Sequence, residues 1–348
     1  MTLEKVTSLQ VAKKAGVSQS AVSRVFTPGA SASKRTSDRV REAAKDLGYR
    51  PNVLARAMVS GKSRMIGLVV AYLDNLFYPD ALERLSNQLK EKGYHVLIFM
   101  ASQTSGNIDK VLHEILDYQV DGIVLASVAM SSDLASECQK ADVPVVLFNR
   151  SQDDDRLSAV GSNNVSGGRK IAEFLVDGGH EKIAHIAGWE GASTQRDRET
   201  GFISGLNSAG LKLFSREVGN FEIEQAKEAA RRMFDRDNYP DAVFVANDHM
   251  AIGVMDVLRI ELGLKVPEDV SVIGYDDVSA AEWSAYSLTT VRQPAKQLVE
   301  ETVSILMDQI ENKAKNPRRI AIDLSLIHIS EPTRPERIAV GGVWVEKK

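Results

Sequence analysis

The spacing of hydrophobic and polar positions changes at about residue 65 of the chain. Before that point, apolar residues recur at three- and four-residue intervals, which predicts short amphipathic helices without strands. Residues that favour helix ends divide this stretch into three helices. Their expected starts and stops are Ser8, Gly16, Ser18, Thr36 and Gly48.

From Met65 on, short apolar runs alternate with amphipathic stretches. Buried parallel strands joined by helices produce this rhythm. The runs form two groups, divided near residues 159–164, which predicts two doubly wound parallel-sheet lobes. The expected strands are Met65–Ala71, Val96–Met100, Gly122–Leu125, Val145–Phe148, Ile183–Ala187, Ala242–Ala246 and Val270–Gly274.

The composition is that of a soluble globular protein. The 348 residues are 43% hydrophobic and 26% charged, which excludes a disordered, collagen-like or disulfide-scaffold chain. No apolar run is long enough to span a membrane, and Met1–Lys14 lacks the apolar segment of a secretory signal. Cys138 is the single cysteine, so no internal disulfide can form. We therefore expect a cytoplasmic protein.

The charge is unevenly distributed along the chain. Residues 1–60 hold 11 Lys and Arg against 4 Asp and Glu, a net +7, whereas the whole chain carries −4 and the remainder therefore −11. A basic head on an acidic body favours a polyanionic partner for the head alone. The alternative is a chance cluster of solvated lysine and arginine side chains.

One motif lies within residues 8–26, which read SLQVAKKAGVSQSAVSRVF. It predicts a helix, a tight turn at Gly16 and a second helix capped by Ser18. The second helix would bury Ala21, Val22 and Val25 and expose short polar side chains and one arginine, which suits a DNA major groove. A generic pair of surface helices has the same pattern, but the basic charge around it favours DNA.

The chain resembles bacterial transcription regulators of the lactose-repressor family (LacI/GalR) over about residues 7–325. The resemblance rests on the order and spacing of the motifs VAKKAGVSQSAVSRV, LGYRPNVLARAM, SRMIGLVV, GHEKIAHIAG, RDRETGF, VFVANDHMAIGVM, PEDVSVIGYDD and LTTVRQP. It implies an all-α helix-turn-helix head, a hinge helix and an α/β core of two doubly wound parallel-sheet lobes like a periplasmic sugar-binding protein. It also implies a homodimer that binds a pseudo-palindromic double-stranded operator.

The resemblance places the DNA contacts in the head and the hinge. It assigns base reading to Gln19, Ser20 and Arg24, while Ser18 and Ser23 contact phosphates, which position the protein without specifying sequence. Arg24 also suits a phosphate contact, and that alternative stays open.

In the hinge, Met58 stands where the family usually has leucine, and it would wedge into the minor groove. Ala55 is small enough for close approach to that groove. Read without the resemblance, Met58 is more often a packing residue. The turn after the second helix departs from the family, because Thr27 stands where asparagine is usual.

Polar residues follow several predicted strands, where open α/β sheets bind ligands. These are Asn149-Arg150, Asn247-Asp248 and Asp276-Asp277, and amide and carboxylate groups suit sugar hydroxyls. We expect an effector site formed by Phe77, Tyr78, Asn149, Arg198, Phe221, Asn247, Asp276 and Trp283. Two alternatives stay open: Asn247 caps the next helix, and the aromatic residues belong to the core.

The sequence carries no enzyme signature of the G-x-S-x-G, P-loop or H-E-x-x-H kind, and no cysteine pair for zinc. We expect no catalytic residue, no cofactor and no metal site, and interpret Asp153-Asp154-Asp155 as a solvated loop. A solute-binding receptor for import would share the core, but not the basic head. An α/β enzyme with a DNA-binding head would need a nucleophile and a base.

We therefore divide the chain into a DNA-binding head (1–50), a hinge helix and linker (51–64), an effector-binding and dimerisation core (65–325) and a tail (326–348). The tail ends in HISEPTRPERIAVGGVWVEKK, which resembles a translated sequencing adapter. A genuine tail with a strand over Ile338–Val345 is the alternative. The sequence as a whole predicts a transcription regulator, a repressor, whose operator affinity responds to a small sugar-like molecule between the lobes.

Overall fold

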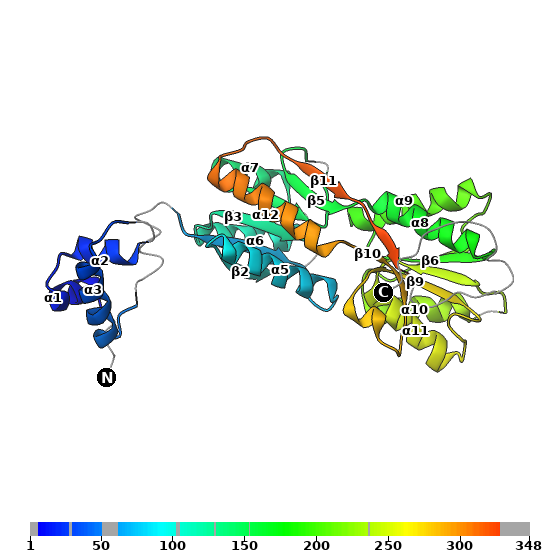
Figure 1. Ribbon diagram of the computed structural model, residues 1–348. Coiled ribbons are helices and arrows are strands. Elements are labelled where there is room, and N and C mark those ends of the chain that lie inside the picture. Colours follow the sequence, from blue (N-terminus) through cyan, green and yellow to red (C-terminus); the bar gives the residue numbers. More distant parts are fainter. Residues whose placement is uncertain are drawn as a thin grey trace. The chain divides into compact units, whose positions relative to one another are not determined.

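The computed structural model describes residues 6–27, 30–50, 62–101, 105–128, 130–152, 154–235 and 237–327, without the side chains of residues 105–107. It divides into two compact units, residues 1–64 and residues 65–348 (Figure 1). The first is called the head here and the second the core. Each unit is described by itself.

The head contains three helices, α1 (Ser8–Ala15), α2 (Gln19–Phe26) and α3 (Lys34–Leu47). Ser18 caps α2 as expected, and Gly16 and Gly48 end α1 and α3 in the left-handed conformation, which glycine adopts at little cost. Ser8 is the first residue of α1, as expected, and Thr7 before it forms a capping box with Gln10. The expected start at Thr36 is wrong, because Ser33 caps α3.

A small apolar core holds the head together. The buried side chains come from all three helices and are Val11, Ala12, Ala15, Val22, Val40, Ala43 and Ala44. Phe26 and Tyr49 pack beside this core with their ring centroids 6.0 Å apart. Since the buried side chains are mostly small, this packing orients α1 and α2 with little apolar area.

The first lobe of the core is a six-stranded sheet with the strand order β11-β5-β4-β3-β1-β2, and its pairs are all parallel. The strands are β1 (Met65–Val70), β2 (His95–Met100), β3 (Gly122–Ala126), β4 (Val145–Phe148), β5 (Ser158–Ser162) and β11 (Arg319–Ile322). Helices α5 (Phe77–Glu91) and α12 (Ala295–Glu311) pack on one face, and α6 (Ser105–Asp117) and α7 (Ser132–Lys140) on the other.

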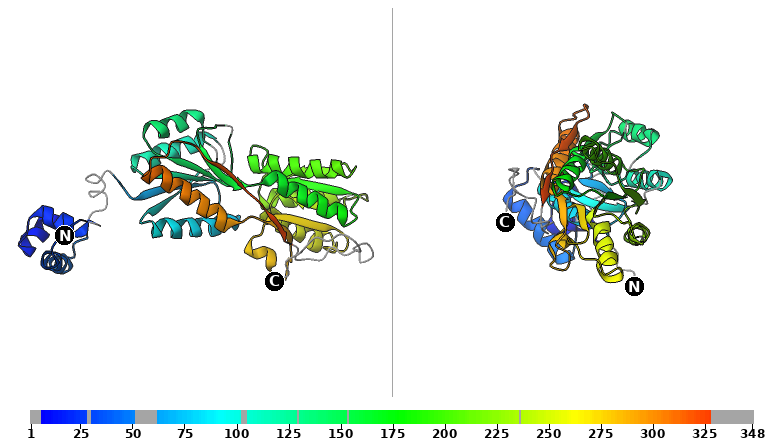
Figure 2. Two further views of the ribbon diagram at one scale, coloured as in Figure 1. Left: turned by 45° about the horizontal axis from the view of Figure 1, so that its top comes forward. Right: turned by 90° about the vertical axis from the view of Figure 1, so that its right-hand side faces the viewer.

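The second lobe repeats this arrangement with the order β12-β10-β9-β8-β6-β7. Its strands are β6 (Ile183–Ala187), β7 (Ser215–Val218), β8 (Ala242–Val245), β9 (Ser271–Asp276), β10 (Thr289–Arg292) and β12 (Ser325–Ile327). Helices α8 (Asn164–Asp177) and α9 (Ser193–Ser208) cover one face, and α10 (Ile223–Phe234) and α11 (Asp248–Asp256) the other (Figure 2). The expected fold of two doubly wound lobes is confirmed.

The two lobes are not consecutive along the chain, which the sequence did not indicate. After β10 the chain returns to the first lobe for α12 and β11, and it then crosses again to add β12 antiparallel to β10. The residues expected to begin a doubtful tail at 326 therefore lie inside strand β12. The remainder of that tail, including Ile338–Val345, lies outside the described residues.

Two glycines bring α8 and α9 unusually close together. A Cβ atom on Gly168 would lie 2.0 Å from the backbone oxygen of Arg198, and one on Gly201 would lie 1.9 Å from that of Val165. Both distances are far below van der Waals contact, so only glycine fits at these positions. The close packing fixes the position of α9, which carries Arg198.

None of the described helices combines the length and the apolar character that a membrane span requires.

Candidate functional site

The exposed side of helix α2 carries the residues that the sequence assigned to DNA. Ser18, Gln19, Ser20, Ser23 and Arg24 are all exposed, while Val22 on the opposite side is buried. The Ser18 hydroxyl oxygen accepts a hydrogen bond from the backbone N–H of Ala21. The Gln19 amide donates to Ser8 Oγ at 2.9 Å, which orients its side chain at the start of the helix. A short polar surface at the N-terminal end of a capped helix has the form that enters a major groove.

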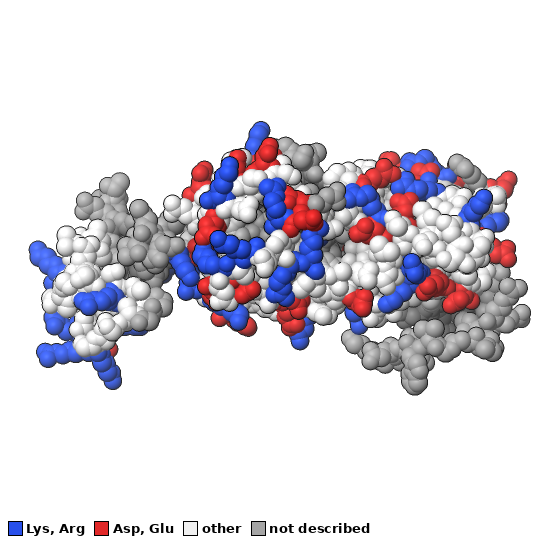
Figure 3. Space-filling model, turned by 90° about the horizontal axis from the view of Figure 1, so that it is seen from above, with Lys and Arg blue, Asp and Glu red and all other residues white. Residues whose placement is uncertain are grey.

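The surface of the head is predominantly basic. Figure 3 shows several Lys and Arg side chains on the visible side of the head and very little acidic surface. Arg24 and Arg41 line a hollow of about 390 Å³ beside the end of α2. These charges suit a phosphate backbone, because each neutralised phosphate releases counterions.

The structure describes only part of the hinge and of the turn after α2. Ala55 and Met58 lie outside the described residues, as do residues 28 and 29 of the turn after α2. Thr27, which precedes that turn, ends α2 and donates its hydroxyl to the backbone oxygen of Ser23.

In the core, the carboxyl ends of the strands of one lobe contact those of the other. Asn75, which follows β1, donates from Nδ2 to Asp276 Oδ2 at the end of β9, with a distance of 3.1 Å. The backbone N–H of Ser151, after β4, donates to Ser193 Oγ at 3.0 Å. We call the side chains gathered at these facing strand ends the inter-lobe junction.

Several residues at or just after the strand ends in this junction have unusual backbone angles. Ser127, Asn149, Phe221 and Asp276, at or just after the ends of β3, β4, β7 and β9, have φ values of 63°, 54°, 63° and 132°. Residues other than glycine rarely adopt such angles, and the cost of each is about 1–3 kcal/mol unless the surrounding structure enforces it. Strain of this kind concentrates at ligand-binding sites.

Arg198 and Asp276 form a buried ion pair in the junction, with 3.5 Å between Nη2 and Oδ1. The Arg198 guanidinium also donates to the backbone oxygen of Ala246 at 2.6 Å and to Asn164 Oδ1 at 3.0 Å. It lies over the Tyr275 ring, 3.6 Å from the centroid. Asp276 accepts a further hydrogen bond from Gln293 Nε2 at 2.6 Å. This network holds both charged groups in fixed positions.

A second carboxylate, Asp248, lies beside Asp276. Burial raises the pKa of Asp248 to about 7, and the neighbouring negative charge of Asp276 adds to that rise. The pKa of Asp276 is also raised by burial, while the Arg198 guanidinium opposes the rise. Asp248 accepts hydrogen bonds from the Thr290 hydroxyl at 2.6 Å and from the Val278 backbone N–H at 3.0 Å, which connect the start of α11 to β10.

Several buried polar atoms in the junction have no hydrogen-bond partner among the described residues. They include Asn149 Oδ1 and Arg150 Nε from the first lobe and Asn247 Nδ2 from the second. A buried donor or acceptor without a partner costs about 1–3 kcal/mol, so such groups are rare unless a ligand or water satisfies them. An acceptor and two donors from both lobes are the groups that a polyhydroxylated ligand would use.

Comparisons with known proteins agree with this arrangement. A profile for bacterial regulatory proteins of the lacI family matches residues 9–52, and one for a periplasmic binding protein-like domain matches residues 172–328. The HTH-type transcriptional repressor PurR of Vibrio vulnificus (strain CMCP6) is 31% identical over 318 residues, covering 88% of this chain and 93% of that protein. PurR of Vibrio cholerae serotype O1 (strain M66-2) is 32% identical over 320 residues, covering 89% of this chain and 93% of that protein.

The chain belongs to the lacI family of bacterial regulatory proteins.

Solved structures support the same conclusion. The lac repressor dimer bound to operator and the anti-inducer ONPF has a TM-score of 0.83 and 26% identity, covering 93% of this chain and 98% of that chain. The transcriptional regulator CelR in complex with cellobiose has a TM-score of 0.70 and 29% identity, with the same coverage. In this lacI-family regulator, the lacI profile matches the helical head, and the periplasmic binding protein-like profile matches part of the two-lobed core.

The structure brings together four of the eight residues that the sequence proposed for the effector. Asn149, Arg198, Asn247 and Asp276 lie at the junction. The alternative that Asn247 caps the next helix is confirmed, because its Oδ1 accepts from the Met250 backbone N–H, and its Nδ2 has no partner among the described residues. Trp283 is 57% exposed, and among the described residues no hydrogen bond or ring contact joins its side chain to the others.

The three other aromatic residues are buried at helix and strand ends. Phe77 stacks on Phe148 with 6.4 Å between centroids, and Tyr78 contacts the Phe77 ring edge-on at 5.4 Å. Phe221 packs on Gly188, where a Cβ would lie 2.3 Å from its ring. All three thus contribute to the apolar core, and the core alternative holds for them in this structure.

Sequence reasoning did not select Asn75, Gln293 or Arg150. Asn75 and Gln293 donate hydrogen bonds to Asp276, and they are separated from it by 201 and 17 positions in the sequence. No regular spacing in the sequence connects these three residues. Arg150 follows Asn149 directly, and its place after a predicted strand was the available signal.

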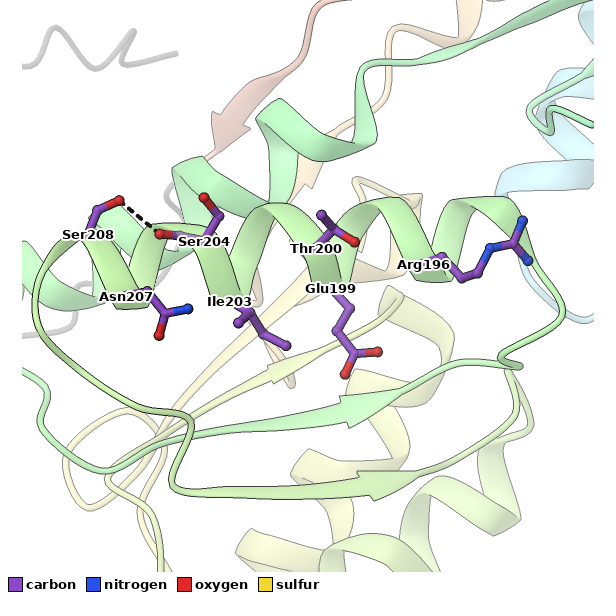
Figure 4. Close-up of a pocket in the computed structure, with 7 residues that line it drawn as sticks. All are labelled: Arg196, Glu199, Thr200, Ile203, Ser204, Asn207 and Ser208. Carbon is purple, nitrogen blue, oxygen red and sulfur yellow. Dashed lines mark hydrogen bonds between the residues drawn. The ribbon is translucent and has the colours of Figure 1, made fainter. Parts of the chain in front are cut away.

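A second hollow, larger than the one beside α2, lies away from this junction. It measures about 790 Å³ and runs along a face of α9 lined by Arg196, Glu199, Thr200, Ile203, Ser204, Asn207 and Ser208 (Figure 4). Its residues belong to one helix, and the Ser208 hydroxyl donates to the Ser204 backbone oxygen rather than towards a ligand. The hollow is therefore a surface depression on one helix.

Proposed function

We propose that this lacI-family regulator represses transcription by binding a pseudo-palindromic operator as a homodimer, and that a sugar or sugar derivative bound at the inter-lobe junction controls its operator affinity. We also propose that it acts in the cytoplasm and has no catalytic role. The curated relatives are transcriptional repressors, and the named structures include an operator complex and a cellobiose complex.

The observation that carries the proposal is the set of unsatisfied groups shared by the two lobes. Asn149 Oδ1 belongs to the first lobe and Asn247 Nδ2 to the second, so a ligand that satisfies both also connects the lobes. Any ligand that binds one relative arrangement of the lobes better than another shifts the equilibrium between them. A typical coupling of this kind is about 1–3 kcal/mol.

In the head, we propose that Gln19, Ser20 and Arg24 read bases and that Ser18 and Ser23 hold phosphates. The exposure of all five side chains on one capped helix supports this assignment. Arg24 would contribute about 1–3 kcal/mol of discrimination if it donates to guanine O6 and N7.

For the hinge, we propose that Ala55 lies against the minor groove and that Met58 inserts between base steps, as the family resemblance implies. Opening of the lobes would then change how two hinges meet on DNA.

The test removes one partner of the buried ion pair between Arg198 and Asp276. Asp276→Ala should remove the ligand response because it removes the acceptor that Arg198 and Asn75 hold in place, while operator binding by the untouched head remains. Operator binding is measured by fluorescence anisotropy, and ligand binding by calorimetry.

A matched control is Glu261→Ala, which removes an exposed carboxylate paired with Arg231 in the same lobe. It should leave both measurements unchanged. An Asp276→Ala protein that responds to ligand as the wild type does would place the effector elsewhere.

A further inference from the structure

The inter-lobe junction contains two buried arginines of very different surroundings. Arg150 is 4% exposed and Arg198 is 3% exposed. Arg198 has the Asp276 carboxylate as its partner. Among the described residues, no carboxylate lies within ion-pairing distance of the Arg150 guanidinium.

The contacts that Arg150 does make are with neutral groups. Its Nη2 donates to Ser127 Oγ at 3.2 Å, and its guanidinium lies 5.8 Å from the centre of the Trp189 ring, which belongs to the other lobe. Its Nε has no partner among the described residues although it is buried. Burial lowers the pKa of Arg150 from its ordinary value, and the positive charges of Arg196 and Arg198 lower it further, while Tyr72 and Tyr78 oppose this. Even so, a guanidinium remains charged in proteins.

A buried charge without a partner is costly, and proteins that keep one usually bring a counter-ion to it. The nearby carboxylates do not serve, because Asp276 is already held by Arg198, Asn75 and Gln293, and Asp248 is turned towards Thr290 and Val278. The remaining positive charge faces the junction where Asn149 Oδ1 and Asn247 Nδ2 also lack partners among the described residues.

We infer that the effector carries an anionic group, a carboxylate or a phosphate, and that Arg150 is the residue that binds it. The inference rests on the proposed effector site at the junction and specifies its ligand class. The anion accepts from Nε and from the guanidinium edge, which forms the two-pronged pairing that arginine favours. The neutral part of the effector then meets Asn149 and Asn247. Trp189 covers the guanidinium from the second lobe, so binding at Arg150 also acts on the lobe contact.

The first test needs no ligand, because it compares the two arginines by their effect on stability. Arg150→Met removes an unpaired buried charge while keeping an unbranched side chain of similar length, so the Tm of the ligand-free protein should rise by about 2 °C or more. Arg198→Met is the matched control. It removes an equally buried charge that has a partner, leaves Asp276 unpaired, and should lower the Tm. A fall in Tm for Arg150→Met comparable to that of Arg198→Met would show a structural arginine and overturn the inference.

The second test measures anion binding by thermal shift at constant ionic strength. Potassium phosphate and potassium acetate are compared with potassium chloride, and glucose 6-phosphate and gluconate are compared with glucose. At least one anion series should raise the Tm of the wild type above its neutral or chloride reference. The rise should be lost in Arg150→Met and kept in Arg156→Gln, an exposed arginine of the same lobe. The series that responds distinguishes a phosphate from a carboxylate.

The outcomes separate this inference from the proposed function. Glucose could raise the Tm of the wild type and of Arg150→Met equally, with no further rise from either anion. This result would keep an effector site at the junction but would overturn the inference that the effector carries an anionic group. Anion stabilisation that persists unchanged in Arg150→Met would also overturn it. Anion stabilisation lost in Arg150→Met, but without any effect on operator binding, would support the inference and contradict the proposed control of the operator.

Discussion

The close approach of α8 and α9 gives a prediction whose size can be worked out from the structure. An alanine Cβ at Gly168 would lie 2.0 Å from the backbone oxygen of Arg198 and 2.8 Å from the backbone nitrogen of Phe202. Both are backbone atoms of α9, so no side-chain rotation relieves the clash. Gly168→Ala must therefore move the two helices apart.

The shorter distance is about 1–1.5 Å below ordinary contact. Overpacking of this kind costs about 1–3 kcal/mol and occasionally more. Since 1 kcal/mol corresponds to about 2–4 °C for a domain of 150–250 residues, the Tm of the core should fall by roughly 2–12 °C. Thermal unfolding followed by circular dichroism measures this.

The same displacement affects the proposed effector site, because the clashing oxygen belongs to Arg198 itself. Its guanidinium holds the backbone oxygen of Ala246 at 2.6 Å and Asp276 at 3.5 Å, and a shift of about 1 Å removes that geometry. Ligand affinity, measured by calorimetry, should fall at least about tenfold, the loss expected for 1.4 kcal/mol.

The matched control is Gly178→Ala on the same helix. Gly178 ends α8 with a φ of −69°, and a Cβ there would meet its nearest neighbours at 3.4 Å, which is ordinary contact. This variant should melt within about 1 °C of the wild type or slightly above it. Equal melting temperatures for Gly168→Ala and Gly178→Ala would refute the reasoning that the α8–α9 contact positions Arg198.

Three further predictions concern pH, salt and the hinge. Asp248→Asn should remove a pH dependence. In the folded protein the pKa of Asp248 is raised from 3.8 to about 7. The free energy of unfolding of the wild type should therefore fall relative to that of this variant as pH rises from about 4 to 7. The upper limit of this loss is about 1.4 kcal/mol per pK unit. Denaturant unfolding across this range measures the difference, and parallel curves would contradict the assignment. Operator affinity of the full chain should fall steeply between about 50 and 200 mM salt, and a flat titration would exclude phosphate contacts by the basic head. Met58→Ala should weaken operator binding and reduce DNA bending, whereas Met58→Leu should be near neutral; equal affinity for both variants would leave the wedge without support.

The fold could be predicted from the sequence where a strand is buried along its whole length. Strands β1, β3 and β4 are buried nearly throughout, and their uninterrupted apolar runs predict them directly. Strands β7 and β12 are short and at most partly buried. The sequence SREV of β7 is mostly polar, and SLI of β12 is only three residues long, so neither carries the apolar run of a buried strand. The return of the chain from the second lobe to the first also leaves no local signal.

The residues of the proposed effector site could be predicted only in part, for a related reason. Asn149, Asn247 and Asp276 follow predicted strands, and topology alone brings such positions together. What a sequence does not show is which of two buried arginines has a carboxylate partner. Arg198 and Arg150 have the same chemistry, and the fold alone gives one of them Asp276 and the other Trp189.

The central claim is that ligand binding in the core controls DNA binding by the head. It is tested most directly by the affinity of the full chain for a DNA fragment selected by that chain in vitro, measured by fluorescence anisotropy with and without a compound that stabilises the core. The dissociation constant should change by about 5- to 150-fold, the range of a 1–3 kcal/mol coupling. A truncated chain that begins at Ser63 should bind the same compound and no DNA. An unchanged dissociation constant in the presence of saturating compound would contradict the account.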